Sequence, residues 1–228
     1  MSKTEAEGAS AENQQSKAQR PSRHIRRSGK IQGYRVSLKV EGGRIPFWTS
    51  LQLDAMRLLD VDQRVQQYSP CDLPPVAVHV SGKRLGYRAL LTVRLARTTV
   101  VFDIVRENGA LVDTLRQAYA AQGFVYTFLE ERRIRQEPAF TNALEIEHAR
   151  CVEVSEDLAL FAKRTLGRGI TDLGGFETAL AEWQTYRPPP RGGLLIKPRM
   201  LAYALFLRGH IRFDPFTAPL DAHTPVSL

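Results

Sequence analysis

The spacing of apolar and polar residues changes along the chain, and each spacing predicts a different element. Residues 34–47, YRVSLKVEGGRIPF, alternate around a Gly-Gly pair, which is typical of a β-hairpin. Residues 49–62 follow a helical period instead, with Thr49 or Ser50 available as the N-cap. Four apolar residues of this segment share one helical face: Leu51, Ala55, Leu58 and Leu59. A hairpin followed by an amphipathic helix is therefore predicted.

The middle of the chain predicts further strands separated by helices. Residues 76–95 indicate two strands across a Ser-Gly turn, and residues 98–105, TTVVFDIV, are almost continuously apolar, as in a strand buried on both faces. Three more elements follow: a helix over 110–123 closed by Gly123, a buried strand over 124–130, and a helix that begins at Asn142. This order predicts an α/β protein with a mixed central sheet flanked by helices.

The part of the chain after Cys151 has a helical pattern. Helices are predicted over 155–167, beginning at a Ser cap, and over 172–183 and 199–209, with RPPPRGG as a linker or rigid turn between the last two. Residues 210–220 predict a short strand followed by coil interrupted by proline. We therefore expect three units: a disordered basic arm over 1–32, an α/β domain over 33–150, and a small helical or winged-helix-like module over 151–228.

The charge balance indicates an anionic partner. The 228 residues include 32 Lys and Arg against 24 Asp and Glu, which gives a net charge of +8 and a pI near 9.8. A pI above about 9 is a usual feature of nucleic-acid-binding domains. Frequent arginine in a GC-rich genome would produce the same balance without a nucleic-acid partner.

The N-terminal arm carries part of this charge in a segregated form. Its acids come first, and a basic run follows that can contact phosphates or serve as a solvated tail. The candidate DNA-binding residues of the arm are Arg20, Arg23, Arg26, Arg27 and Lys30. The arm contains no apolar leader, no apolar run reaches the length needed to cross a bilayer, and Cys71 and Cys151 lie far apart. We therefore expect reduced thiols, no membrane contact and a bacterial cytoplasmic location.

Five stretches of the chain carry a family resemblance, from about Gly43 to the C-terminus. They are FWTSLQLDAMRLLDVDQRV, QYSPCDLPPVAVHVSGKRLGYRALLTV, VVFDIV, AYAAQGFVYTFLEERRIRQEPAFTNALEI and LFLRGHIRFDPFTAPLDAHTPV. In this order they resemble TnsA, the endonuclease subunit of heteromeric transposases. The resemblance implies a restriction-endonuclease-like fold, DNA as a partner, and docking with a transposase catalytic subunit and an AAA ATPase regulator.

The resemblance also implies where a nuclease site would stand. Such an enzyme holds a divalent metal with carboxylates from separate elements and places a lysine beside the attacking water. The corresponding positions here are Gln52, Leu90, Asp103 and Val105. Asp103 is the one acid among them, so we expect a degenerate site with no catalytic residue, no metal and no cofactor. An active Mg²⁺-dependent endonuclease with rearranged ligands, which cleaves the 5′ ends of a transposon, remains the alternative.

The other charged residues allow two interpretations. In EERRIRQ, residues 130–136, Arg132, Arg133 and Arg135 are candidate contacts to a DNA backbone or members of a solvated turn. Asp54, Asp60 and Asp62 are interpreted as exposed acids of a helix and turn rather than relocated metal ligands. The histidines show no metal-ligand spacing. A small interaction protein with no role on DNA is the third hypothesis.

Overall fold

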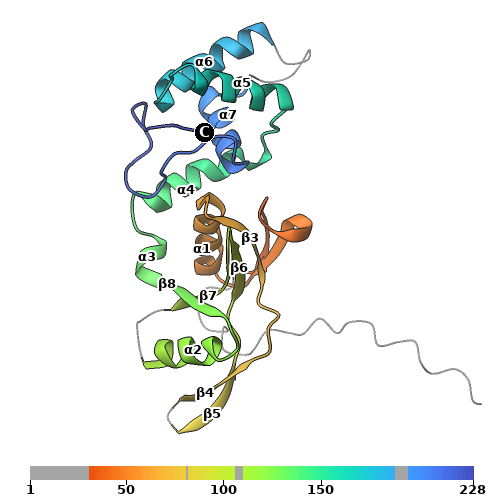
Figure 1. The fold of residues 1–228 in the computed structure, drawn as a ribbon, viewed down its shortest axis with the longest axis vertical. Coiled ribbons are helices and arrows are strands. Elements are labelled where there is room, and N and C mark those ends of the chain that lie inside the picture. Colours follow the sequence, from red (N-terminus) through yellow and green to blue (C-terminus); the bar gives the residue numbers. More distant parts are fainter. Residues whose placement is uncertain (1–30, 81, 106–109, 188–194) are drawn as a thin grey trace, which may run out of the picture.

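The computed structural model describes residues 31–80, 82–105, 110–187 and 195–228 (Figure 1). The predicted arm over 1–32 lies outside this range except for its last two residues, so its DNA-binding candidates stay predictions. A sheet and two hairpins occupy the lower part of the molecule as drawn in Figure 1, and three helices, α5, α6 and α7, occupy the upper part. No helix of the described ranges is long and apolar enough to cross a membrane.

The central sheet has four strands in the order β3-β6-β7-β8. Their bounds are Val65–Pro70, Leu91–Leu95, Thr99–Val105 and Val125–Glu130. The first three strands pair antiparallel, whereas β7 and β8 pair parallel. Because parallel neighbours require a crossover, the chain passes through α2 (Ala110–Ala120) between them. The predicted α/β class with a mixed sheet flanked by helices is confirmed.

Two hairpins form separate two-stranded sheets. β1 (Gly33–Val36) pairs with β2 (Arg44–Phe47), and β4 (Val76–Val80) pairs with β5 (Lys83–Tyr87). The first turn includes the short 3-10 helix η2 (Glu41–Gly43), whose glycines Gly42 and Gly43 have φ near +70°, a conformation that favours glycine. The predicted hairpin over 34–47 is confirmed.

The strand prediction for residues 76–95 needs a correction. Its second strand is divided at residues 88–90 into β5 and β6, which belong to different sheets. The sequence analysis also missed β3, because VQQYSP has little apolar alternation to mark it. Pairing with β6, which lies far along the chain, stabilises that segment as a strand.

Strand β7 forms the centre of the sheet. Val100 and Phe102 pack on one face, in a cluster with Met56 of α1, whereas Val101 packs on the other face with Leu115 of α2. The two helices therefore cover opposite faces of this strand, and its prediction as a doubly buried strand is confirmed.

Helix α1 (Ser50–Val61) begins where its sequence predicts. Thr49 is the N-cap, and its hydroxyl oxygen accepts a hydrogen bond from the backbone N–H of Gln52 at 3.1 Å. One side of the helix packs in the cluster with β7, and the other side packs with the C-terminal helices through Ala55 and Leu58. Helix α1 is therefore shared between two cores.

The remaining helices are short and closely packed. They are α3 (Glu131–Ile134), α4 (Ala139–Glu147), η3 (His148–Cys151), α5 (Glu156–Gly167), α6 (Leu173–Tyr186) and α7 (Pro198–Leu207). Ser155 caps α5 as predicted, with its Oγ accepting from the N–H of Leu158 at 3.2 Å. Asn142 does not begin α4. It is buried inside the helix, and its Nδ2 donates to the carbonyl oxygens of Pro215 and Ala218.

The C-terminal segment differs from its prediction. The expected strand after His210 is reduced to isolated bridges, one of which joins Arg212 to Ser227, and no wing-like hairpin forms among residues 195–228. Three prolines, Pro215, Pro219 and Pro225, interrupt the segment and explain this outcome.

The division of the chain at residue 150 stays a prediction. One apolar cluster contains residues from both sides of it, including Ala55 and Ile146 before the division and Phe176 and Leu205 after it. The two predicted units therefore share a hydrophobic core.

Candidate functional site

Asp103 is the acid that the nuclease resemblance points to, and it lies in the middle of β7. Its side chain is buried, with a residue exposure of 7%. One carboxylate oxygen accepts the hydroxyl hydrogen of Tyr87, and the other accepts the backbone N–H of Ile104 at 2.8 Å. Desolvation by burial raises the pKa of Asp103 to about 6, although both hydrogen bonds oppose that rise. The carboxylate therefore loses part of its charge at mildly acidic pH.

Gln52 has a local structural role at the start of α1. Its side-chain oxygen accepts the backbone N–H of Trp48 at 2.7 Å, while its own backbone N–H donates to Thr49. This reciprocal arrangement is a variant of the capping box, in which a Thr and a Gln three residues apart satisfy the free N–H groups of a helix start. The Gln52 oxygen is thus already used within α1.

Leu90 and Val105 pack on different clusters. Leu90 packs against the cluster that contains Val93 and Phe102, and Val105 packs against the cluster that contains Val101. No hydrogen bond or ion pair joins any two of Gln52, Leu90, Asp103 and Val105 in the described structure. Mg²⁺ takes several oxygen ligands at about 2.1 Å. One acid, one engaged amide and two hydrocarbon side chains do not fit that ion.

No other metal site replaces this one in the part of the chain that the structure describes. No group of three His, Cys, Asp or Glu side chains is close enough there to hold an ion. A cavity of about 420 Å³ lies between the end of α1 and the C-terminal segment, bordered by Arg64, Arg212 and Phe216. The four positions of the nuclease frame do not line it.

The interpretation of Asp54, Asp60 and Asp62 as exposed acids was wrong, since the side chains of Asp60 and Asp62 are only 13% and 17% exposed. Asp54 is 4% exposed, and its two carboxylate oxygens accept from Arg57 at 2.5 Å and from Arg135 at 2.7 Å. Asp60 accepts from Arg35, from Ser37 at 2.6 Å and from the hydroxyl of Tyr68 at 2.8 Å. The polar side of α1 is covered by β1, α3 and α4 rather than by solvent.

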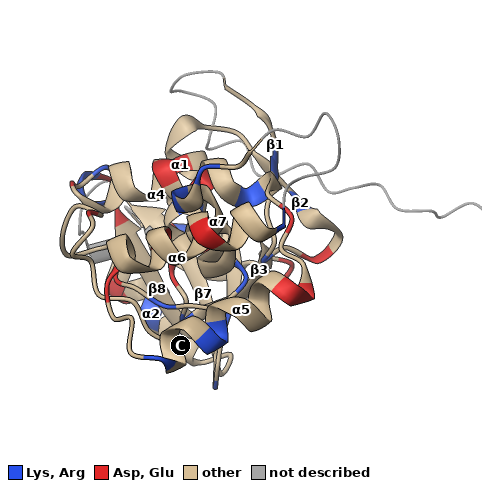
Figure 2. Cartoon of the chain, turned by 90° about the horizontal axis from the view of Figure 1, so that it is seen from above, with Lys and Arg blue, Asp and Glu red and all other residues tan. Residues whose placement is uncertain are grey.

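A single network of ion pairs connects these acids. Glu147 of α4 accepts from Arg35 and from Arg57, each at 2.6 Å, so it joins the Asp60 and Asp54 groups. Burial opposes the charge of Arg35, but the carboxylates of Asp60 and Glu147 outweigh it and raise the pKa of the guanidinium. Figure 2 shows the acidic and basic segments around α1 and β1. Because Arg35 and Glu147 are 112 residues apart, no local pattern in the sequence could indicate the pair.

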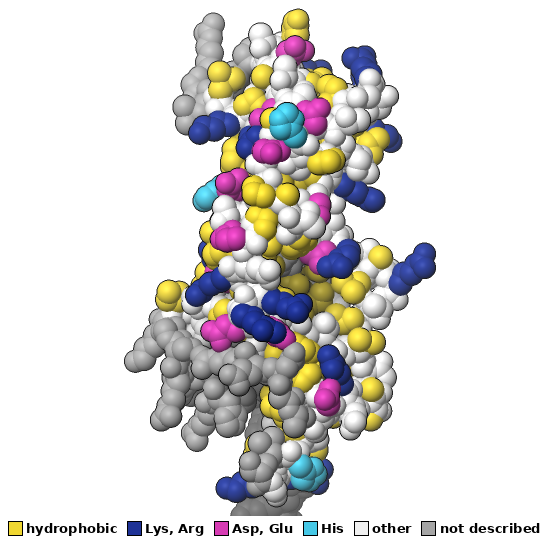
Figure 3. Space-filling model, turned by 90° about the vertical axis from the view of Figure 1, so that its left-hand side faces the viewer, with side chains coloured by type: hydrophobic (Ala, Val, Ile, Leu, Met, Phe, Trp, Pro, Cys, Tyr) yellow, Lys and Arg dark blue, Asp and Glu magenta, His cyan; other side chains and the backbone are white. Residues whose placement is uncertain are grey.

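The candidate phosphate contacts on α3 are exposed but paired. The side chains of Arg132 and Arg133 are 77% and 64% exposed, and both face Glu130, at 2.5 and 3.7 Å. The hydrogen bond from Arg132 lowers the pKa of Glu130. Arg135 is paired with Asp54 instead. Figure 3 shows one face of the molecule, on which Lys and Arg side chains are scattered among acidic and apolar side chains.

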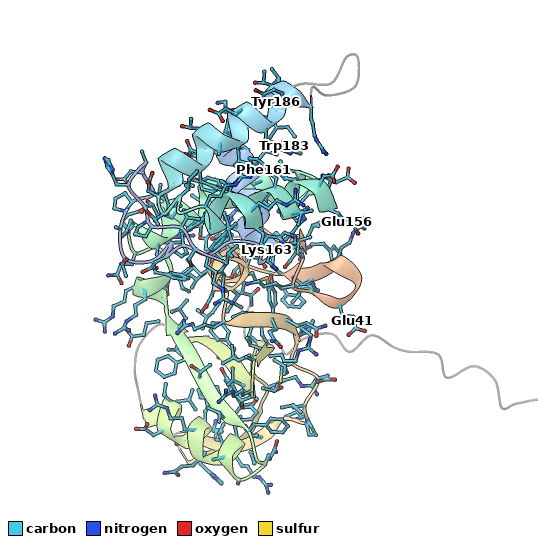
Figure 4. All side chains as sticks on the ribbon, turned by 45° about the horizontal axis from the view of Figure 1, so that its top comes forward. Glu41, Glu156, Phe161, Lys163, Trp183 and Tyr186 are labelled. Atoms are coloured by element: carbon cyan, nitrogen blue, oxygen red, sulfur yellow. The ribbon has the colours of Figure 1, made fainter. Side chains whose placement is uncertain are left out.

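The C-terminal helices carry a group of aromatic side chains, of which Tyr186 is exposed and Phe161 and Trp183 are half-buried. Phe161 of α5 and Trp183 of α6 have ring centroids 6.0 Å apart, and Tyr186, one turn beyond Trp183, is 86% exposed (Figure 4). The guanidinium of Arg187 lies 5.8 Å from the Trp183 ring centroid and pairs with Asp157. Exposed aromatic groups beside arginine are typical of protein interfaces.

No protein-family model matches the chain, and no curated protein has a matching sequence. The resemblance to TnsA is therefore carried by the quoted residues alone.

Proposed function

We propose that this chain is a TnsA-like DNA transposition protein with a degenerate nuclease site. It binds DNA in the bacterial cytoplasm and docks with the transposase catalytic subunit and the AAA ATPase regulator of a mobile element. The mixed sheet β3-β6-β7-β8, with α1 and α2 on its opposite faces, is compatible with a restriction-endonuclease-like fold. That compatibility supports the proposal together with the sequence resemblance.

The burial and hydrogen bonding of Asp103 are the observation that supports a degenerate nuclease site. A nuclease carboxylate must present charged oxygens to a metal, but Tyr87 and Ile104 already occupy those of Asp103. Burial without a paired cation also raises its pKa, which favours the neutral acid. Leu90 and Val105 stand where the nuclease frame has an acid and a lysine, and their side chains supply neither an oxygen ligand nor an amine.

The charge of the chain and its aromatic surface support the binding part of the proposal. A net charge of +8 favours contact with phosphates, and the arginines of α3 could exchange Glu130 for a phosphate oxygen. The surface around Trp183 and Tyr186 provides rigid aromatic groups for a protein partner.

A plasmid nicking assay tests the degenerate site. Supercoiled DNA is incubated with the full chain in Mg²⁺ or Mn²⁺, beside Asp103→Ala and the surface control Asp113→Ala. We expect all three proteins to leave the plasmid supercoiled. Cleavage by the native chain that Asp103→Ala abolishes and Asp113→Ala retains would support the active endonuclease instead.

A binding assay tests the contact with DNA. Retention of a duplex by the full chain should weaken steeply as salt rises, because bound phosphates release counterions. Retention that is absent at low salt, or that does not change with salt, would support an interaction protein with no role on DNA.

A further inference from the structure

On one face of the β3–β6 strand pair the side chains are polar or basic, and α2 does not pack against them. The register pairs Gln67 with Arg94 and Ser69 with Thr92. Paired residues on neighbouring strands point to the same side of a sheet, so these four form one surface. The residues between them, Tyr68 and Val93, point to the opposite side and belong to the apolar cluster with α1.

Helix α2 covers only the neighbouring part of that face. Its buried residues Val112 and Leu115 pack with Val101 of β7, Tyr126 of β8 and Val78 of β4. No residue of β3 or β6 belongs to that cluster. Gln67 and Ser69 are half-buried and Arg94 is exposed, so the end of this face toward the β6–β7 turn is open to solvent.

The open surface is basic and free of acids along its own strands. Residues 65–70 and 91–99 contain no Asp or Glu, and they include Arg94 and Arg97. Neither arginine has an ion pair among the described residues, in contrast to Arg132 and Arg133. Asp103 projects from the same face of β7, but it is buried and bonded to Tyr87.

We propose that this face, formed by Gln67, Ser69 and Arg94 together with the exposed Arg97 of the adjoining β6–β7 turn, binds the phosphate backbone of duplex DNA. Arginine, Ser and Gln side chains are usual donors to phosphate oxygens, and such contacts position a protein without reading sequence. Arg94 and Arg97 reach a phosphate without first breaking an ion pair, which distinguishes them from the arginines of α3. The inference rests on the proposed DNA binding and specifies where on the sheet it occurs.

The test compares two double variants of the full chain that each remove two positive charges. Arg94→Ala/Arg97→Ala changes the proposed face. Arg164→Ala/Arg168→Ala, at the end of α5, changes two exposed arginines that also have no ion pair in the described structure. Binding to a fluorescent duplex is measured by anisotropy from low to high salt, and the thermal unfolding midpoint of each variant confirms that it folds.

The logarithm of the association constant falls linearly with the logarithm of salt concentration, and the loss of two phosphate contacts should make this slope less steep by about 1.8. If the native chain and Arg94→Ala/Arg97→Ala bind the duplex equally at about 1 M salt, this change of slope means that the variant binds roughly 60-fold more weakly than the native chain at about 0.1 M salt. The α5 variant should keep the native slope. Arg94→Lys/Arg97→Lys, which keeps both charges, should recover most of the slope.

Three outcomes would overturn the inference. If the native chain shows no salt-dependent binding, the proposed DNA function fails and the face fails with it. If the native chain binds but Arg94→Ala/Arg97→Ala keeps its affinity and slope, the face is refuted while DNA binding stands. The same conclusion follows if both double variants weaken binding equally, since net charge alone would then explain the effect.

Discussion

Replacing Asp103 with asparagine should stabilise the protein at neutral and alkaline pH. Asparagine resembles the neutral acid in shape, and its side-chain oxygen can still accept the Tyr87 hydroxyl, but its amide nitrogen cannot accept the backbone N–H of Ile104. It removes the charge that burial disfavours. Since the carboxylate has no paired cation among the described residues, the exchange relieves desolvation without breaking an ion pair.

The magnitude follows from the pKa of Asp103, which burial raises from 3.8 to about 6. One pKa unit is worth about 1.36 kcal/mol, so full ionisation in the fold costs about 3 kcal/mol relative to the unfolded chain. Between these values the folded protein binds more protons than the unfolded chain, so this contribution to stability is present below about 3.8 and is lost as pH rises through 6. The stability of Asp103→Asn relative to the native chain should therefore start at or below zero at acidic pH, because the Ile104 hydrogen bond is lost, and should rise with pH by at most about 3 kcal/mol up to pH 8.

The assay is urea unfolding from pH 4 to pH 8, followed by circular dichroism, for the native chain and two variants. Asp113→Asn is the control, because the side chain of Asp113 is 75% exposed and should change stability little at any pH. A native chain that gains stability over Asp103→Asn as pH rises would refute the reasoning. Such a result would mean that a favourable partner, such as a bound cation, stabilises the charged carboxylate.

Three further predictions concern the elements around this site. Glu147→Gln should lower the free energy of unfolding by about 1 to 3 kcal/mol, because it removes the charge that Arg35 and Arg57 share while Arg35 keeps its pair with Asp60. Urea unfolding against the exposed control Glu153→Gln measures this, and equal losses would contradict it. Burial lowers the pKa of Lys39 from 10.5 to about 8, so the unfolded chain binds more protons than the folded protein between these pH values, and the stability that depends on this group rises with pH there. Lys39→Met should flatten this rise of the unfolding free energy with pH in a urea titration from pH 8 to pH 10.5. An unchanged slope would rule out this role of Lys39. Thr49→Ala should cost about 1 kcal/mol by removing the α1 cap, whereas Thr49→Ser should cost little, and similar losses in thermal unfolding would exclude a capping role.

The elements with a strong local signal were predictable from the sequence. The first hairpin has a Gly-Gly turn between alternating strands, α1 has a Thr cap before a helical period, and β7 is a short apolar run. In each case, the residues that determine the element lie within a few positions of one another. The mixed α/β class followed from the order of these elements.

Three structural features could not be predicted in this way. Strand β3 has a weak pattern of its own and depends on pairing with β6, and the break between β5 and β6 depends on which sheet each strand joins. Asn142 resembles a helix cap by residue type, yet its hydrogen bonds to Pro215 and Ala218 place it inside α4.

The sequence by itself determined residue identity at the candidate site: the side chains of Leu90 and Val105 cannot ligate a metal in any fold, because they contain no oxygen. Only the tertiary structure decided what the remaining polar groups do. In the folded protein Asp103 accepts a hydrogen bond from Tyr87, Asp54 forms ion pairs with two arginines, and Arg94 is exposed to solvent. Burial and pairing depend on segments that are distant along the chain, and they determine whether a charged group is held by a partner, neutralised or available to a ligand.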